Sequence, residues 1–340
     1  MWGDRMKNTS RIFALLLALA LAAGLLAGCG ETSQGAASQA PETDGAYTDA
    51  VAAADADLEE EAVALSEAPA LSTDLMPVAS GTLVKSNAKA NIDYSNTQDG
   101  YVMVKYTVST SQKLKAQVKG PGGTTYTYNI SPGTWTTFPL SDGSGSYKVT
   151  VYENISGTKY STVLSASFTA ALTDEFAPFL RPNQYVNYAQ NAEKTVAKAA
   201  VLCADMTDPL DKVKAVYGFV VTNITYDKQK AASVQSGYLP VLDDVLTSKK
   251  GICFDYAALM TAMLRSEDVP CKLVVGYAGT AYHAWISVYS PDQGWIDAAI
   301  YFDGNTWQRM DPTFASSGKQ SSTIMKYIGD GSHYTVKYLY

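Results

Sequence analysis

The chain has 340 residues, of which 46% are hydrophobic and 17% charged, and its formal net charge is −7. This length allows about two domains. Acids and bases are unevenly distributed, because residues 31–84 hold eleven acids and no lysine or arginine, whereas residues 85–340 carry a net charge of only +2. A nearly neutral segment without a basic stripe argues against nucleic acid as a partner.

An apolar run follows a basic start at the N-terminus. Arg5, Lys7 and Arg11 come before or at the edge of IFALLLALALAAGLL at 12–26, which is typical of a secretory signal and short for a membrane span. The run ends in LAGC, which resembles a bacterial lipobox. The resemblance implies cleavage before Cys29 and lipidation of its thiol; the alternative is an ordinary signal peptide. We expect a lipoprotein signal peptide over 1–29, and lipid anchoring at the extracellular face of a bacterial cell membrane.

The acidic segment comes next and is expected to be a disordered tether over 30–89. Its composition is dominated by alanine, serine, threonine and acids. Such a segment buries too little apolar surface to offset the entropy of ordering it. About 55 flexible residues span roughly 40 Å on average, and more when like charges repel.

Residues 90–172 change character to short β-branched and aromatic runs separated by turn residues. In Tyr147, Val149 and Val151 the apolar side chains alternate with polar ones, a pattern typical of a half-buried strand. Turn clusters stand at 120–123, 131–133 and 141–145. Six or seven strands in about 80 residues predict an all-β immunoglobulin-like sandwich. It would act as a spacer or as a binding module, and the sequence slightly favours the spacer.

Residues 173–340 begin with helical patterns and end with strand patterns. Asp208 followed by Pro209 is a helix-start signal. Helix patterns cover 191–205, 208–224, 239–248 and 253–268, and strand patterns follow from Cys271 onward, with turns at SPDQG and FDGN. Helices followed by an antiparallel sheet predict an α+β domain.

Cys253 stands where the last of these helices begins, between a glycine-containing turn and an apolar stretch. Amide donors and the helix dipole at this position favour a thiolate, which is the nucleophilic form. Of the two histidines, His283 lies in the strand pattern YHAWISVY between two large rings, whereas His333 follows a glycine-rich turn and is expected at the surface. A cysteine–histidine site needs an orienting acid, for which Asp311 before Pro312 is the first choice and Asp297 the competitor.

Three blocks, GICFDYAALMTAMLRSEDVPCKLVVGY, YHAWISVY and MDPTF, resemble the bacterial transglutaminase-like superfamily, which has a papain-like fold. The order Cys, His, Asp with separations of 30 and 28 positions fits that resemblance, as does NITYD at 223–227. It covers roughly residues 180–315. It implies Cys253 as the nucleophile, His283 as the base and acid, and Asp311 as the orienting acid.

The chain departs from many members of that superfamily directly after the histidine. Ile286 and Ser287 stand where an acid or amide is common, and the stretch GWIDAAIYFDG intervenes before the Asp-Pro block. The alternative of Asp297 therefore stays open. The second oxyanion donor is also open, with Tyr226 and Gln235 as candidates.

The remaining acid and thiols near these blocks are expected to be structural. Asp255 is predicted to close the start of the helix rather than to act in catalysis. Cys203 and Cys271 are expected to be packing residues, and a disulfide between them is a less favoured alternative. Two distant histidines and scattered cysteines offer no zinc site, so neither a metal nor another cofactor is expected.

The sequence thus predicts a surface lipoprotein whose α+β domain at 173–340 forms a thioester on Cys253 from an amide. It would be a transglutaminase-like cysteine protease, amidase or acyltransferase acting on peptide, protein or cell-wall peptide substrates. The alternative is a non-catalytic surface binding or adhesion protein that uses a degenerate version of the same fold.

Overall fold

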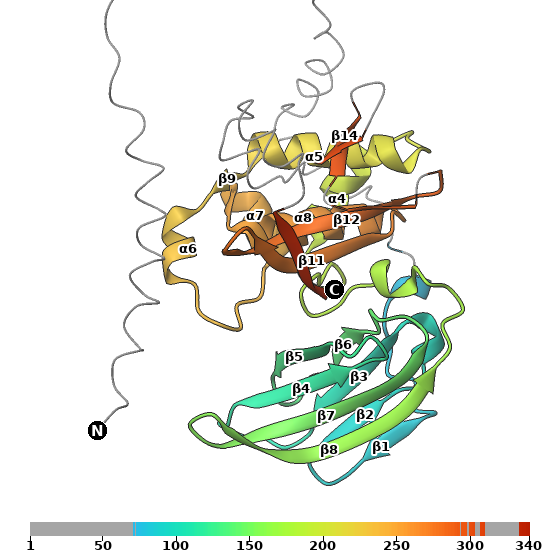
Figure 1. The fold of residues 1–340 in the computed structure, drawn as a ribbon, viewed down its shortest axis with the longest axis vertical. Helices are drawn as coiled ribbons and strands as arrows, with labels where there is room; N and C mark the ends of the chain where they lie inside the picture. The colour runs from blue at the N-terminus through green and yellow to red at the C-terminus, as the bar shows by residue number, and fades with distance from the viewer. Residues whose placement is uncertain (1–70, 72, 293, 298, 303–306, 310–332) are drawn as a thin grey trace, which may run out of the picture. The chain divides into compact units, whose positions relative to one another are not determined.

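The computed structural model describes residue 71 and residues 73–292, 294–297, 299–302, 307–309 and 333–340 (Figure 1). The predicted signal peptide, Cys29 and Asp311 lie outside these residues. Among the described residues, no helix has the length and apolar character needed to cross a membrane.

The β-rich part consists of two antiparallel four-stranded sheets (Figure 1). One has the order β1-β2-β3-β6 and the other the order β5-β4-β7-β8. The strands are β1 (Val84–Ser86), β2 (Ala90–Asp93), β3 (Tyr101–Tyr106), β4 (Leu114–Lys119), β5 (Thr125–Ile130), β6 (Thr136–Pro139), β7 (Gly145–Ser156) and β8 (Lys159–Ala170). Strand β1 lies within the segment 30–89 that was predicted to be a disordered tether, so the β-rich part begins before residue 90. An immunoglobulin-like fold for this part stays a prediction.

Alternation along the strands explains how the two sheets form a common core. In β5 the side chains of Tyr126, Tyr128 and Ile130 are buried, whereas the intervening ones face solvent. The rings of Tyr128 in one sheet and Phe138 in the other lie 4.3 Å apart between centroids. Period-two patterning of this kind buries one face of each sheet against the other.

The second part begins with helices, which the 3₁₀ turn at Ala177–Phe179 precedes. The α-helices are α4 (Glu193–Leu202), α5 (Pro209–Asn223), α6 (Lys228–Ser233), α7 (Leu242–Ser248) and α8 (Cys253–Ser266), and single 3₁₀ turns occupy Thr73–Leu75, Thr97–Asp99 and Ala177–Phe179. The carboxylate of Asp208 accepts the N–H of Leu210 at 2.8 Å, so the predicted cap of α5 is confirmed. Helix α6 was not predicted from the sequence.

Helix α8 is the central element of the second part. It packs against α4, α5 and α7 and against strands β11 (Cys271–Ala278) and β12 (Ala281–Ser290) (Figure 1). Every residue from Asp255 to Arg265 is buried. The helix is enclosed on all sides because helices and a sheet cover it from different directions.

The C-terminal end of α8 holds a fully buried arginine. Arg265 donates to the carbonyl oxygens of Cys271 at 2.9 Å, Arg181 at 2.7 Å and Tyr340 at 2.7 Å. Burial lowers the pKa of Arg265 to about 10, which leaves the guanidinium charged at neutral pH. Three segments far apart in the sequence are therefore joined at this end of the helix.

The sheet of the second part has the order β13-β12-β11-β16. β13 (Gly294–Asp297) forms the predicted hairpin with β12, and β16 (Tyr334–Leu339), which was not predicted, pairs antiparallel with β11. β14 (Ala299–Phe302) and β15 (Trp307–Arg309) form a separate pair, so β13 and β14, which are close in sequence, belong to different sheets.

Candidate active site

Cys253 is the first residue of α8, as predicted. Its thiol is free and partly buried. Ile252 before it is extended and has no side-chain acceptor, so the amides of the first turn are not capped by that side chain. A thiol at this position faces amide donors and the positive end of the helix dipole, which favour a thiolate and an oxyanion.

A short parallel strand pair holds the backbone directly before Cys253. β9 (Thr225–Tyr226) pairs with β10 (Lys250–Gly251), and Gly251 is opposite Tyr226. A Cβ atom on Gly251 would lie 2.6 Å from the Cβ of Asp255, so only glycine permits this close approach to the helix. The pair therefore places Tyr226 next to the start of α8.

Tyr226 is the better supported of the two oxyanion candidates. Burial, and next the charge of Cys253, raises the pKa of Tyr226 to about 12, so its hydroxyl stays protonated as a donor near the thiol. Gln235 is exposed, and its amide Nε2 donates to the carbonyl oxygen of Ser233 at 2.8 Å within its own loop. We therefore keep Tyr226 as the candidate.

His283 lies near the start of β12, opposite Gly276 of β11. Its side chain is buried, and its ring centroid is 6.1 Å from that of Trp285 and 6.4 Å from that of Tyr334. From the sequence, Tyr282 and Trp285 were expected to enclose the imidazole. Tyr282 is instead 60% exposed, because neighbouring residues of a strand point to opposite faces, and Tyr334 of β16 takes its place.

Tyr282, which precedes His283 in the sequence, is affected by the charge of Cys253. Burial of part of the ring raises the pKa of Tyr282, and the charges of Tyr338, Tyr277 and Cys253 act in the same direction. The thiol is thus within electrostatic range of the residue next to His283. Helix α8, which begins with Cys253, packs against strand β12, which carries His283.

The orienting acid stays a prediction. Asp311 lies outside the described residues. The backbone of Asp297 belongs to β13 and pairs with Ser287 of β12, next to the strand that carries His283. Neither position distinguishes the two candidates. His333 is exposed, as expected.

Cys203 and Cys271 are both buried free thiols, which contradicts the alternative of a disulfide between them. Burial raises the pKa of Cys203 to about 12 and that of Cys271 to about 11. The Sγ atom of Cys271 also contacts Thr261 Oγ1 at 3.6 Å. Both thiols are packing residues, as predicted, and their environments disfavour the reactive form.

Asp255 closes the start of α8, as predicted, but it also has partners that sequence reasoning missed. Its Oδ2 accepts the N–H of Ile252 at 2.8 Å and lies 2.7 Å from Lys230 Nζ, and its Oδ1 accepts the hydroxyl of Tyr238 at 2.6 Å. The carboxylate is fully buried. Lys230 and Tyr238 stand 25 and 17 positions before it, and no spacing rule would have paired them.

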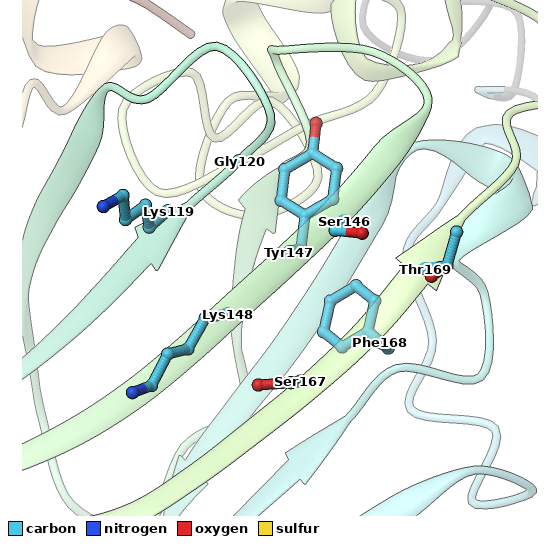
Figure 2. A pocket seen from close by; sticks show the side chains of 8 residues that line it. All are labelled: Lys119, Gly120, Ser146, Tyr147, Lys148, Ser167, Phe168 and Thr169. Carbon is cyan, nitrogen blue, oxygen red and sulfur yellow. The ribbon is translucent and has the colours of Figure 1, made fainter.

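Two other features do not add to this site. Within the described part of the chain, no group of three histidine, cysteine or acidic side chains could hold a metal ion. A shallow hollow of about 440 Å³ lies on β4, β7 and β8, lined by Lys119, Lys148 and neighbouring residues (Figure 2). None of the candidate catalytic residues lines it.

Comparison with known proteins identifies the second part. Residues 197–312 match the family model of the transglutaminase-like superfamily, and this range includes Cys253, His283 and Asp311. The chain contains a transglutaminase-like core domain. The resemblance seen in the three sequence blocks is thereby confirmed.

Curated relatives of the transglutaminase-like domain are much longer proteins. The uncharacterized protein YebA of Bacillus subtilis is 26% identical over 34% of this chain and 18% of its own length. A protein-glutamine gamma-glutamyltransferase of Pseudomonas aeruginosa is 31% identical over 16% of this chain and 10% of its own length. The chain thus spans less than a fifth of either relative.

Solved structures with a likeness to the chain include a candidate cysteine protease of Cytophaga hutchinsonii, with 15% identity and a TM-score of 0.35 over 71% of this chain and 76% of that one. The transglutaminase of red sea bream has 14% identity and a TM-score of 0.26 over 63% of this chain and 48% of that one.

Proposed function

We propose that the transglutaminase-like domain is an acyl-transfer enzyme that forms a thioester on Cys253. The observation that carries the proposal is the contrast among three free thiols. Cys253 alone of the three starts a helix and is partly accessible, while Cys203 and Cys271 are buried in surroundings that raise their pKa values. All three thiols lie within the range 197–312 that matches the superfamily, so position and accessibility, not the match, favour Cys253.

In the proposed reaction the thiolate attacks the carbonyl carbon of an amide. The first-turn amides of α8 and the hydroxyl of Tyr226 would stabilise the oxyanion. His283 takes the thiol proton and returns it to the leaving amine as the carbon–nitrogen bond breaks, while Asp311 holds the imidazole, with Asp297 as the alternative. Water then releases an acid, or a second amine forms a new amide.

The substrate class proposed is a peptide or protein amide, including cell-wall peptides. The Pseudomonas aeruginosa relative is named a protein-glutamine gamma-glutamyltransferase, which supports a glutamine side chain as one acyl donor. Hydrolysis and transamidation share the thioester, so the acceptor alone separates them.

The location proposed is the extracellular face of a bacterial membrane, through lipid on Cys29 and the acidic tether. Cys29→Ala should move the protein from the membrane fraction to the medium or leave it unprocessed. Normal processing with unchanged membrane retention would exclude lipidation. The β-rich part is proposed to be an immunoglobulin-like spacer in this arrangement.

The second candidate is a non-catalytic binding or adhesion protein. It is supported by Ile286 and Ser287, which stand after His283 where many members of the superfamily have an acid or amide. A binding protein would leave Cys253 without a covalent acyl intermediate on any peptide.

The proposed function is tested by trapping the thioester. The full chain is mixed with a glutamine-containing peptide, quenched in acid and analysed by mass spectrometry of the Cys253 peptide. We expect an acyl adduct on Cys253 that hydroxylamine removes, and none in Cys253→Ala. Peptide binding without any adduct, in a panel that also includes cell-wall peptides, would favour the binding protein.

A further inference from the structure

The segment 227–239 is a surface segment that returns to the start of α8. It follows β9, and its first residue, Asp227, donates its N–H to the carbonyl oxygen of Gly251 at 2.9 Å. Residues 231–237 are all exposed, with Val234 37% exposed. A segment with so little buried surface depends on a few polar contacts for its position.

Two of its side chains reach Asp255. Lys230 Nζ lies 2.7 Å from Oδ2 and 2.5 Å from the Tyr238 hydroxyl oxygen, and that hydroxyl donates to Oδ1 at 2.6 Å. The ammonium also lies 4.4 Å from the centroid of the Tyr238 ring. Among the described residues, two side-chain interactions connect residues 228–239 with residues outside the segment, and both are made to Asp255. The other side-chain hydrogen bonds of these residues stay within the segment. We name Asp255, Lys230 and Tyr238 the helix-start network.

The position of this carboxylate is chemically significant. Asp255 is fully buried and stands two residues after Cys253 on the same helix turn. An uncompensated negative charge so near the thiol would oppose formation of the thiolate, against the effect of the helix dipole. The cation of Lys230 offsets that charge, and the Tyr238 hydroxyl satisfies the second oxygen.

We propose that Lys230 and Tyr238 are positioning residues for Cys253, through which the surface segment 227–239 sets the reactivity of the thiol. The inference rests on the proposed function, because it assumes that Cys253 is the nucleophile. Lys230 acts by neutralising Asp255, and Tyr238 acts by holding both partners. A substrate that displaces the segment would thereby change the charge next to the thiol.

Other titratable groups lie around the thiol and the network in the described part of the chain, among them Asp227, whose Oδ1 accepts the N–H of Lys230 at 2.9 Å. The charge of Cys253 acts on Tyr226 of β9 and on Tyr282 of β12, and the charge of Asp244 on α7 acts on Tyr238. Burial, followed by the hydrogen bond to Asp255, raises the pKa of Tyr238, so its hydroxyl stays a donor over the working range. His283 is the proposed base. Lys230 is the cation that contacts Asp255.

The test measures the rate of iodoacetamide labelling of Cys253 against pH in the full chain, by mass spectrometry, with the melting temperature of each variant. In Lys230→Met the half-maximal rate should move up by about one pH unit or more, since a buried carboxylate is left uncompensated. Lys228→Met removes the same charge from an exposed position two residues away and should leave the profile unchanged. Lys230→Arg should restore it.

The double variant Lys230→Met/Asp255→Asn separates electrostatics from folding. Without the carboxylate there is no charge to neutralise, so its half-maximal pH should return to within about 0.3 of the parent protein, even if its melting temperature is lower. Tyr238→Phe should raise the half-maximal pH by a smaller amount than Lys230→Met.

Two results would overturn the inference: a folded Lys230→Met whose profile matches the parent protein, or a double variant that remains shifted as far as Lys230→Met. If Lys230→Met does not fold, the Tyr238→Phe profile and the double variant decide. The proposed function fails separately, when Cys253 in the parent protein labels no faster than Cys203 and Cys271.

Discussion

A charged side chain is buried at each end of α8, and the groups that compensate the charge differ between the two ends. At the C-terminal end, three backbone carbonyls from separate segments accept from Arg265. At the N-terminal end, Asp255 is compensated by Lys230 and Tyr238 from a segment that is largely exposed. The first arrangement joins parts of the fold, whereas the second places polar groups of an exposed segment near the proposed nucleophile, Cys253. We therefore expect changes at the C-terminal end to alter stability and changes at the N-terminal end to alter reactivity.

The largest expected effect is a loss of turnover without a loss of stability, when the proposed orienting acid is replaced. Asp311→Asn should lower the rate of acyl transfer by about four orders of magnitude, because the acid sets the tautomer of His283 and stabilises the imidazolium. The melting temperature should change little, since amide and carboxylate are similar in size. Turnover and melting curves of this variant check the prediction.

Asp297→Asn is the matched control, and it should do little. If Asp297→Asn is the inactive variant instead, the acid is supplied by β13 and the assignment of Asp311 is wrong. If neither change matters while Cys253→Ala is inactive, the site works as a dyad.

The second effect is a loss of stability without a change in reactivity, when the buried arginine at the C-terminal end of α8 is replaced. Arg265→Met leaves three carbonyl oxygens without their donor, and we expect a loss of about 3–5 kcal/mol in the free energy of unfolding. Urea unfolding measures the loss. In the fraction that remains folded, the pH profile of Cys253 labelling should match that of the parent protein; a shifted profile would show that the two ends are not independent.

A third change should affect both the stability of the fold and the reactivity of Cys253, because it acts on the backbone directly before α8. Gly251→Ala places a Cβ atom 2.6 Å from the Cβ of Asp255. Overpacking of this kind costs about 1–3 kcal/mol, and displacement of Asp255 should also slow labelling of Cys253 at neutral pH. Parallel unfolding and labelling measurements check this; lost stability with normal labelling would place Asp255 among the purely structural groups.

The smallest effect is expected at an exposed ion pair, which serves as a reference for the buried charges. Lys214 and Asp211 lie 2.9 Å apart on the surface of α5, with about half of each side chain exposed. Lys214→Met should cost at most about 0.5 kcal/mol. A loss close to that of Arg265→Met would mean that burial is not what separates the two classes of charge.

Local signals predicted the elements of the site well. Asp208 and Pro209 marked the start of α5, the turn SPDQG marked the hairpin of β12 and β13, and the glycine turn before Cys253 marked the start of α8. Each of these depends on a few neighbouring residues, so a single sequence contains the information.

Apart from the short helix α6, the features that were missed depend on contacts between distant segments. Arg265 resembles an exposed basic residue in the last turn of a helix, and only the C-terminal segment and Arg181 make it a buried one. Strand β16 joins the sheet through β11, more than fifty positions earlier. Lys230 and Tyr238 lie in a polar stretch without periodicity, so their shared partner cannot be found from spacing.

The most direct test of the central claim is competitive labelling of the three thiols by iodoacetamide in the folded full chain at pH 6. The account predicts that Cys253 reacts at least about tenfold faster than Cys203 and Cys271, whose burial raises their pKa values. His283→Ala should slow that reaction without unfolding the protein. Equal labelling of all three thiols, or a rate at Cys253 that is indifferent to His283, would contradict the assignment of Cys253 as the nucleophile.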